Sequence, residues 1–476
     1  MNAKITLGIF LMVVSITGHA QSDTHKVQMC PGLPDNSPYR ACGTKLVCGT
    51  PTADTDVTLY KSGDIQAWAQ WREIGPAGAV CDCTAAAQSC KWVAKSSTGI
   101  LAGGTIKFHP GWYLELDPRH NTIKSWSDTI ASYKGTPNLR GFYLILPWIW
   151  FEPSMNVYTA GGGDSAQGFA ALDQLLAVSK ENGFQFILGL DAKAFGTIRA
   201  GTGSYEVLPQ YFDTLVTADG PQGYIRATKR ASGDLVVTVK AYDPAVTARY
   251  NALMQAYGLR YDSNPTLEMF RDSTESANGL FNSGQIAQLP AQYIAWAANA
   301  RKSFPTTGIS LTINFMDTAA QIAQIYEGVL PYAVFIGGPD SFGKGINTVY
   351  APGSGKYDGI SNIVFNGYID GNGNSPGTDY RGKLGWFAET ETPEEVYPGG
   401  SGGIAYQTPQ NVYNEMFGVA DNVAPGTVAS GGNMQPQYFI FSLDAAWQNK
   451  GWSDADMKAF IAAQHPVNTT RPSSYH

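Results

Sequence analysis

The sequence lacks several features that mark common classes of protein. No cysteine follows residue 90, only six of the 476 residues are histidine, and charged residues make up just 15% with a net charge of −7. Phosphate binding needs clustered lysine and arginine, so nucleic acid is not expected as a partner. No cluster has the spacing of a zinc site, and no glycine-rich phosphate turn follows a strand. We therefore expect neither a metal nor a cofactor.

An apolar segment occurs at the N-terminus, and no later run resembles a membrane helix. Lys4 supplies a positive charge, Ile5 to Ile16 are mostly apolar, and small residues precede Ala20. This pattern is typical of a signal peptide, and the apolar part is short for a membrane span. We expect residues 1–20 to be removed after Ala20. The mature chain is then secreted or periplasmic, with no membrane partner.

All the cysteines lie in a short region, 21–98, that follows the expected signal peptide. An even number of cysteines in an exported chain predicts disulfides. A region this small usually needs such covalent links to be stable. Sequence alone does not choose the pairing. The six cysteines are Cys30, Cys42, Cys48, Cys81, Cys83 and Cys90.

From residue 99 to residue 476 the pattern alternates between short apolar runs and helical segments. Such alternation predicts a parallel sheet, and eight units with long loops favour a (β/α)8 TIM barrel, an α/β fold. A doubly wound open sheet is the alternative. The expected strands are Thr105–His109, Gly141–Trp148, Phe184–Leu190, Thr266–Arg271, Gly308–Phe315, Tyr332–Gly337, Lys383–Ala388 and Gln437–Leu443.

Local signals place several elements between these strands. Asp243 before Pro244 is a typical helix start, and Ser453 with Asp456 has the spacing of a capping box. Ala319–Val329 has helical periodicity. Tyr224–Lys229 and Asp234–Lys240 alternate around a Ser-Gly pair and predict a β-hairpin above the third strand.

Two carboxylates follow strands at the end of the barrel where active sites are built. Glu275 comes just after the fourth strand, and Glu389 directly after the seventh, with Glu391 as an alternative two residues on. Two carboxyl groups about 5 Å apart are what retaining glycoside hydrolysis requires. Glu268 is a weaker candidate because it lies early in its strand. Arg271 could stabilise an ionised partner.

The order of these features resembles a large clan of retaining glycosidases that includes cellulases and β-galactosidases. The resemblance covers about residues 100–460. It is carried by the run Trp148–Pro153 (WIWFEP) at the end of strand two and by the glutamates after strands four and seven. It implies that Glu275 is the acid/base and Glu389 the nucleophile. One departure is Thr274, where the clan usually has an asparagine that binds the sugar 2-hydroxyl.

Further side chains at or near strand ends are candidates for binding sugar. Aromatic rings suit the apolar faces of sugar rings, and carboxylates and amides suit hydroxyl groups. The alternatives are packing at the barrel rim for the tryptophans and a salt bridge for Glu152. His109, the one histidine at a strand end, more often has a structural role. The candidates are Trp112, Trp148, Trp150, Trp386 and Trp447, with Glu152, Asp191 and Asn314.

Together these features predict a secreted retaining glycoside hydrolase that acts on a poly- or oligosaccharide. Two alternatives stay open. One is a carbohydrate-binding barrel without catalytic activity, and the other is a polysaccharide lyase.

Overall fold

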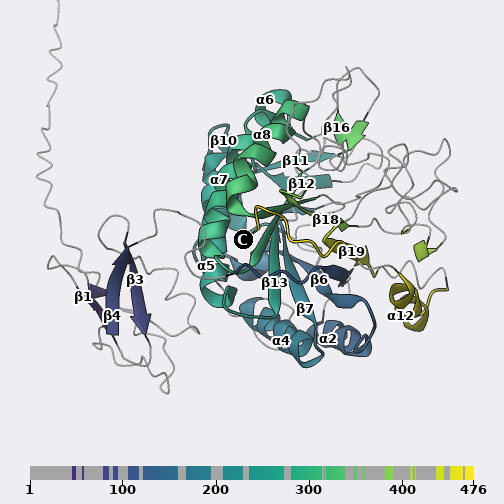
Figure 1. Ribbon diagram of the computed structural model, residues 1–476. Coiled ribbons are helices and arrows are strands. Elements are labelled where there is room, and N and C mark those ends of the chain that lie inside the picture. The colour runs from purple at the N-terminus through teal and green to yellow at the C-terminus, as the bar shows by residue number, and fades with distance from the viewer. Residues whose placement is uncertain are drawn as a thin grey trace, which may run out of the picture. The chain divides into compact units, whose positions relative to one another are not determined.

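The chain divides into two compact units, Met1–Lys61 with Gln70–Ser97 and Ser62–Ala69 with Thr98–His476. The computed structural model describes the first unit by the backbone of four strands, and it describes most of the second (Figure 1). The described residues of the second unit are 105–116, 122–158, 168–194, 207–228, 235–272, 280–313, 316, 318–337, 348–350, 357–359, 380, 382–389, 408–410, 413, 436–443, 451–464 and 467–475.

The N-terminal unit contains a small sheet with the strand order β2-β1-β4-β3. Cys48 and Cys83 each lie opposite Cys90 in the backbone register. Cys30, Cys42 and the expected signal peptide lie outside the described residues, so the disulfides stay a prediction. The strands are β1 (Leu46–Gly49), β2 (Asp56–Val57), β3 (Ala79–Thr84) and β4 (Ser89–Ala94).

The second unit is built on a closed barrel of eight parallel strands, in the order β13-β14-β15-β18-β19-β5-β6-β7. This confirms the predicted TIM barrel and excludes the open sheet. The strands are β5 (Gly111–Glu115), β6 (Leu139–Pro147), β7 (Gln185–Asp191), β13 (Leu267–Asp272), β14 (Gly308–Thr312), β15 (Val334–Gly337), β18 (Gly385–Glu389) and β19 (Tyr438–Ser442).

The first barrel strand is not where the sequence predicts it. Residues 105–110 form no regular element, and the strand begins after Pro110, at Gly111, whose backbone N–H donates to the Gln437 carbonyl at 2.9 Å. Ile106 and Phe108 alternate as strand residues do, but they pack instead against the barrel interior. The prediction of Thr105–His109 as a strand is therefore wrong.

Side chains of the barrel strands alternate between the interior and the outer layer. On β18 and β19, Phe387 and Tyr438 belong to the cluster inside the barrel, which we call the interior cluster. Trp386 and Phe439 belong to the cluster between the strands and the helices, which we call the outer core. This alternation follows from the two-residue repeat of a strand. It decides which residues at a strand end can face the barrel mouth.

β13 contains one irregularity. Its register with β7 shifts between Leu267 and Met269, so that Glu268 is an extra residue. A bulge of this kind changes the direction of a side chain. Glu268 accordingly reaches the interior, where it contacts Tyr438.

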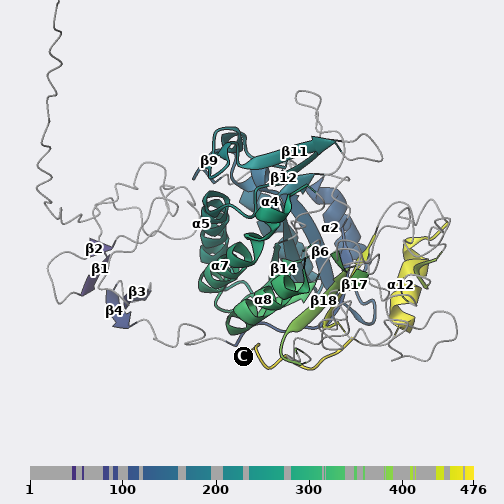
Figure 2. The same cartoon turned by 90° about the horizontal axis from the view of Figure 1, so that it is seen from above.

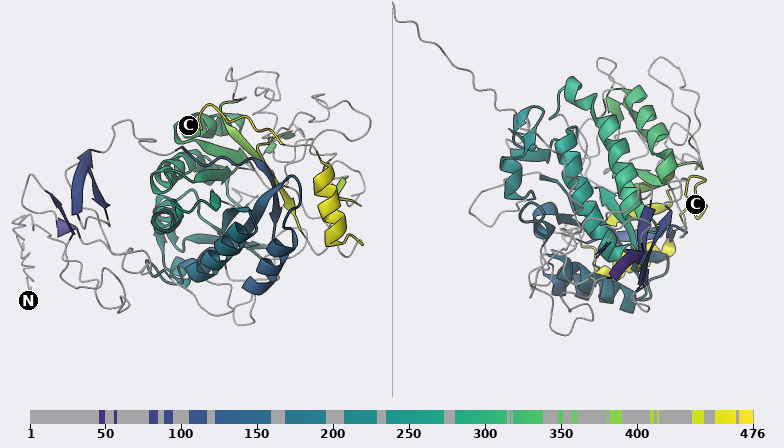
Figure 3. Two further views of the ribbon diagram at one scale, coloured as in Figure 1. Left: turned by 60° about the horizontal axis from the view of Figure 1, so that its bottom comes forward. Right: turned by 90° about the vertical axis from the view of Figure 1, so that its left-hand side faces the viewer.

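Helices cover the outside of the barrel, and α5, α7 and α8 lie side by side (Figure 2; Figure 3, right). The predicted capping is confirmed: Asp243 accepts from the Ala245 N–H at 2.8 Å, and Ser453 with Asp456 forms a capping box. Of the described helices, none is long and apolar enough to span a membrane. The covering helices are α2 (Ile123–Ser132), α4 (Gly168–Glu181), α5 (Pro244–Tyr261), α7 (Leu289–Ser303), α8 (Ala319–Val329) and α12 (Asp454–Ala463).

Shorter elements extend from the barrel. β11 and β12 form the predicted antiparallel hairpin, and β8 adds a third strand that follows β7 directly. The small strands are β8 (Lys193–Ala194), β9 (Val216–Thr217), β10 (Gly220–Pro221), β11 (Tyr224–Thr228), β12 (Leu235–Val239), β16 (Thr348–Tyr350) and β17 (Tyr357–Gly359). The short helices are α3 (Trp148–Phe151), α6 (Ser283–Ile286), η1 (Gln210–Asp213) and η2 (Leu330–Tyr332).

The N-terminal end of the barrel, which we call the base, is closed by the segment before β5 and by the C-terminal tail. Tyr475 is 1% exposed, and its ring packs against Phe335 with centroids 4.6 Å apart. Arg471 donates to the Ile106 carbonyl at 3.0 Å and lies over the Phe108 ring. Two ends of the barrel unit therefore meet at its base.

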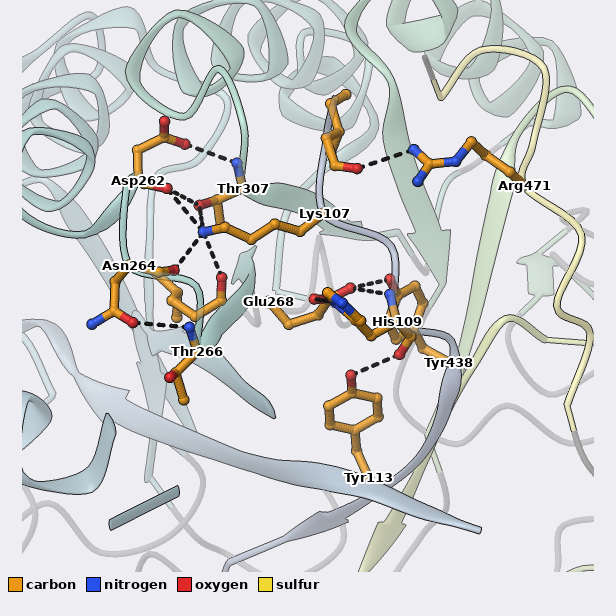
Figure 4. A network of polar contacts seen from close by, with 12 residues as sticks. Lys107, His109, Tyr113, Asp262, Asn264, Thr266, Glu268, Thr307, Tyr438 and Arg471 are labelled. Carbon is orange, nitrogen blue, oxygen red and sulfur yellow. Dashed lines mark hydrogen bonds and ion pairs between the residues drawn. The ribbon is translucent and has the colours of Figure 1, made fainter. Parts of the chain in front are cut away.

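Lys107 links the segment before β5 to the loops that precede β13 and β14 (Figure 4). Its ammonium nitrogen lies within hydrogen-bond distance, 2.6–2.9 Å, of the carbonyl oxygens of Asp262, Asn264 and Leu267 and of the Thr307 hydroxyl. Burial lowers the pKa of Lys107 to about 8, against the attraction of Asp262 and Glu268. The base is thus held together by polar contacts as well as by aromatic packing.

Candidate active site

A buried ion pair lies at the C-terminal end of the barrel strands. Glu389 is the last residue of β18, and by strand alternation it faces inward like Phe387. Arg271, in β13, places its Nη2 atom 2.5 Å from the Glu389 Oε2 atom. Their side chains are 1% and 7% exposed. The fourth and seventh strands therefore meet through these two residues across the barrel.

Aromatic rings and a hydroxyl group surround the guanidinium of Arg271. Its Cζ atom lies 4.9 Å from the centre of the Tyr143 ring and 4.3 Å from that of Phe387. Nη2 also donates to the Thr312 hydroxyl at 3.3 Å. Burial is the largest influence and lowers the pKa of Arg271, but the charge and hydrogen bond of Glu389, together with Tyr143 and Glu115, outweigh it, so the net pKa is raised. Arg271 is therefore a fixed positive charge.

A further carboxylate, Glu115, ends β5 and is half-buried. It is inward-facing by alternation with Tyr113, and its charge also raises the pKa of Arg271. Glu115 was not among the predicted site residues, because the first strand was expected before Pro110. Correct alternation in the segment Gly111–Glu115 is the signal that would have found it.

Several predicted site residues lie outside the described part of the chain. They are Glu275, Asn314, Glu391 and Trp447. The described part of β13 ends at Asp272, three residues before Glu275. The roles of these four residues stay predictions.

Trp148 and Glu152 belong to a buried network outside the strands. Glu152 is fully buried and accepts from Trp148 Nε1 at 2.8 Å, from the Asn156 N–H at 2.8 Å, from the Tyr211 hydroxyl at 2.9 Å and from Arg249. All four donors are protein groups, so the carboxylate has a structural role. The structure favours the salt-bridge interpretation over sugar binding.

Trp112 and Trp386 also differ from the expectation of a sugar-binding surface. They are 1% and 2% exposed and belong to the outer core, where Trp112 stacks on Tyr413 with centroids 5.6 Å apart. Trp386 faces outward because it lies three residues before Glu389, an odd spacing on a strand. Both tryptophans are therefore packing residues of the core, which agrees with the alternative interpretation and not with sugar binding.

Trp150 and Asp191 keep some exposure. Trp150 is half-buried in α3 and packs against the outer core. Asp191 is half-buried at the end of β7, where it accepts from the Lys193 N–H at 3.0 Å. Of the predicted sugar contacts in the described residues, Asp191 is the one whose position at a barrel strand end suits a hydroxyl partner.

Glu268, the alternative carboxylate, lies at the base (Figure 4). It is fully buried and contacts His109 through the backbone N–H and the ring Nδ1 atom, both at 2.7 Å, and the Tyr438 hydroxyl at 2.5 Å. The N-terminal face of a TIM barrel serves stability. Glu268 and His109 are therefore structural. Among the described residues, no group of three histidine, cysteine, aspartate or glutamate side chains is placed to hold a metal.

No family model and no curated protein matches the sequence. Among solved structures, the chain is similar to the catalytic domain of β-amylase from Paenibacillus polymyxa, with 10% identity and a TM-score of 0.44 over 75% of this chain and 98% of that one. It is also similar to β-galactosidase from the psychrophilic Marinomonas ef1, with 10% identity, a TM-score of 0.34, and coverage of 49% and 41%. A third similar structure is endo-glycoceramidase II from Rhodococcus sp., with 12% identity, a TM-score of 0.31, and coverage of 52% of this chain and 68% of that one. The assignment of the fold therefore rests on the closed barrel of eight parallel strands and not on these similarities.

Proposed function

We propose that this chain is a glycoside hydrolase that cleaves a poly- or oligosaccharide with retention, using Glu389 as the nucleophile and Glu275 as the acid/base. The observation that carries the proposal is Glu389 itself. It is a carboxylate at the inner C-terminal end of the seventh barrel strand, held by Arg271 at 2.5 Å. Active sites of TIM barrels are built at this end of the strands.

The proposed roles follow from the chemistry. A nucleophilic carboxylate must be ionised to attack the anomeric carbon, and the other carboxyl group must give a proton to the leaving oxygen. Arg271 supplies a permanent positive charge beside Glu389. Glu275 comes three residues after the last residue of β13, a strand that ends at the same end of the barrel as β18. The expected signal peptide, if present, would export the chain to where an extracellular or periplasmic polysaccharide is found.

Activity on a panel of glycans, with analysis of the products, tests the proposal. Glu389→Gln and Glu275→Gln should each lower turnover by about 100- to 10,000-fold, because each removes a group that takes part in bond breaking. Proton NMR of the first-formed sugar should show the anomeric configuration of the substrate. Glu181→Gln is a matched control, since Glu181 ends α4 and is exposed. It should keep the wild-type rate.

Three outcomes would contradict the proposal. Wild-type rates in both glutamine variants on the substrate found would remove the two glutamates from the mechanism. Binding of a glycan without any product would favour a carbohydrate-binding barrel, and products with an unsaturated ring, detected by ultraviolet absorbance, would favour a lyase.

A further inference from the structure

The first barrel strand, β5, ends in a carboxylate that the proposed mechanism does not use. On β5, Trp112 and Leu114 belong to the outer core, whereas Tyr113 belongs to the interior cluster. The next residue in the same alternation as Tyr113 is Glu115, which is therefore directed into the barrel. Glu115 is half-buried, and the four strand residues before it are buried. It thus lies where the interior of the barrel meets the mouth.

The register of the strands places Glu115 in the same layer as Glu389. Inward-facing residues from alternate strands of a TIM barrel form layers, and a shear of about eight residues around eight strands moves a layer forward by about two residues for every two strands. Glu389 pairs with Ile440 of β19, and Ile440 pairs with Tyr113 of β5. Two residues beyond Tyr113 is Glu115. The two carboxylates therefore share a layer, on strands separated by β19 alone.

The rest of this layer is small or polar. The same rule leads from Glu115 to Gly189 on β7, and from Gly189 to Thr312 on β14. An independent observation agrees with it, because the Nη2 atom of Arg271 lies 3.3 Å from the Thr312 hydroxyl and 2.5 Å from Glu389. Since glycine has no side chain, the layer presents two carboxylates and one hydroxyl group to the barrel axis. These are groups that suit the hydroxyls of a sugar.

The backbone around Glu115 is held on both sides. The Leu443 N–H donates to the Glu115 carbonyl at 3.1 Å, and the Leu116 N–H donates to the Tyr143 carbonyl at 2.8 Å. Binding groups on paired strands are placed more precisely than groups on loops. The end of β5 therefore holds its carboxylate in a defined position at the mouth.

Glu115 and Glu389 are close enough to serve one sugar residue. Strands two apart in a sheet are separated by about 10 Å, and two glutamate side chains can shorten that gap. Carboxyl groups that flank one glycosidic bond lie about 5–9.5 Å apart. The charge of Glu115 also reaches the interior of this group: burial lowers the pKa of Arg271, and the charges that raise it come from Glu389, Tyr143 and Glu115.

We propose that Glu115 is a substrate-contacting residue that determines specificity: its carboxylate accepts a hydrogen bond from a hydroxyl group of the sugar residue that Glu389 attacks. The inference rests on the proposed function. An ionised carboxylate accepts hydrogen bonds and donates none, so it selects a sugar that has a donor at that position. A site built to bond a hydroxyl group rejects the analogue that lacks it, because a polar group of the site is then left unpaired.

The first test compares Glu115→Ala with Glu181→Ala. The probes are p-nitrophenyl glycosides of glucose, galactose, mannose and xylose, and cello-, manno- and xylo-oligosaccharides. On the probe that is cleaved best, Glu115→Ala should lower kcat/KM about 10- to 100-fold, the effect of losing a hydrogen bond to a charged group. Glu115→Gln keeps the shape and one acceptor oxygen and should lose about tenfold or less. Glu181 is exposed at the end of α4, so Glu181→Ala should keep the wild-type value.

Monodeoxy analogues of the same probe separate a substrate contact from a structural role. For wild type, one analogue should lose about 10- to 100-fold in kcat/KM. For Glu115→Ala, that analogue should be within about threefold of the parent probe, because both changes remove the same hydrogen bond. A structural residue would instead lower kcat/KM by one factor for every analogue. That result, or a Glu115→Ala enzyme within about threefold of wild type on every probe, would overturn the proposal. If Glu115→Ala does not fold, Glu115→Gln takes its place.

Binding measured by calorimetry separates this inference from the proposed function, because it needs no turnover. If the protein binds one of the oligosaccharides without cleaving it, and Glu115→Ala weakens that binding about tenfold or more, the hydrolase is contradicted and the contact is supported. If Glu115→Gln loses as much turnover as Glu389→Gln, Glu115 transfers a proton, and the binding role proposed here is wrong. A protein that neither binds nor cleaves any of the probes contradicts both.

Discussion

At the scale of single residues, the partners of a buried carboxylate indicate what it does. Glu152 and Glu268 are fully buried, and protein donors occupy both oxygens of each. Glu389 instead contacts Arg271 through one oxygen and lies at the C-terminal end of a strand. Of the candidate glutamates in the described residues, the bonding of Glu152 and Glu268 marks them as structural and separates them from Glu389, the candidate nucleophile.

His109 should make stability depend on pH. Its bond to Glu268 raises the pKa of the ring above the usual 6.5, against burial, so the folded protein binds this proton more tightly than the unfolded chain. The stabilisation is complete below pH 6.5 and is lost as the pH rises through the raised folded value. It should amount to less than about 1 kcal/mol, because the ring is 45% exposed and water screens the pair.

Urea unfolding of wild type and His109→Gln between pH 5.5 and 8 measures this effect. Glutamine offers an amide donor to Glu268 but does not titrate, so the difference between the two proteins should shrink as the pH rises. Since Lys107 is common to both proteins, its own titration cancels. A difference that is constant across the range would show that His109 acts by packing alone.

At the scale of elements, the apolar runs located seven of the barrel strands, and the capping residues located α5 and α12. These features are local, so they can be read from neighbouring residues. β5 was missed because Ile106 and Phe108 alternate like a strand but pack against a tail that comes from the other end of the chain. The pairing of Arg271 with Glu389 joins residues 118 apart and has no local signal.

Gly308, the first residue of β14, leaves the space that Tyr475 of the C-terminal tail occupies. A Cβ atom there would lie 2.6 Å from the Tyr475 hydroxyl and 3.0 Å from the Glu268 carbonyl. Gly308→Ala should therefore lower the free energy of unfolding by about 1–3 kcal/mol, as overpacking does. Thermal or urea denaturation measures the loss.

Tyr475→Phe removes the atom that an alanine at position 308 would meet most closely. Combined with Gly308→Ala, it should recover part of the lost stability, so the two changes should not be additive. Strict additivity would mean that the tail does not occupy the base as described.

At the scale of the whole molecule, the two ends of the barrel are built differently. The base is filled by Tyr475, Tyr438 and Lys107, whose contacts join distant segments. The mouth holds charged side chains on β5, β13 and β18, and the long connections start there. Stability and the proposed chemistry are thus assigned to opposite ends of the same eight strands.

Reducing agent should affect the two units unequally. Every cysteine lies at or before Cys90, so no disulfide can cross the barrel strands. In calorimetry, dithiothreitol should lower the unfolding temperature of the N-terminal unit and leave the barrel transition within about 2 °C. Loss of the expected disulfides should cost the small unit about 2–5 kcal/mol. A barrel transition that falls equally would show that its stability depends on the cysteine-rich unit.

The extra residue in β13 has an implication for how this strand tolerates change. Glu268 and Arg271 are three positions apart, a spacing that in a regular strand sends two side chains to opposite faces. The bulge lets one strand carry a charge inward at both of its ends. A single-residue deletion at the bulge would restore the regular repeat, and one of the two charges would then turn toward the helices. We therefore expect β13 to tolerate the substitution of most of its residues better than the deletion of one.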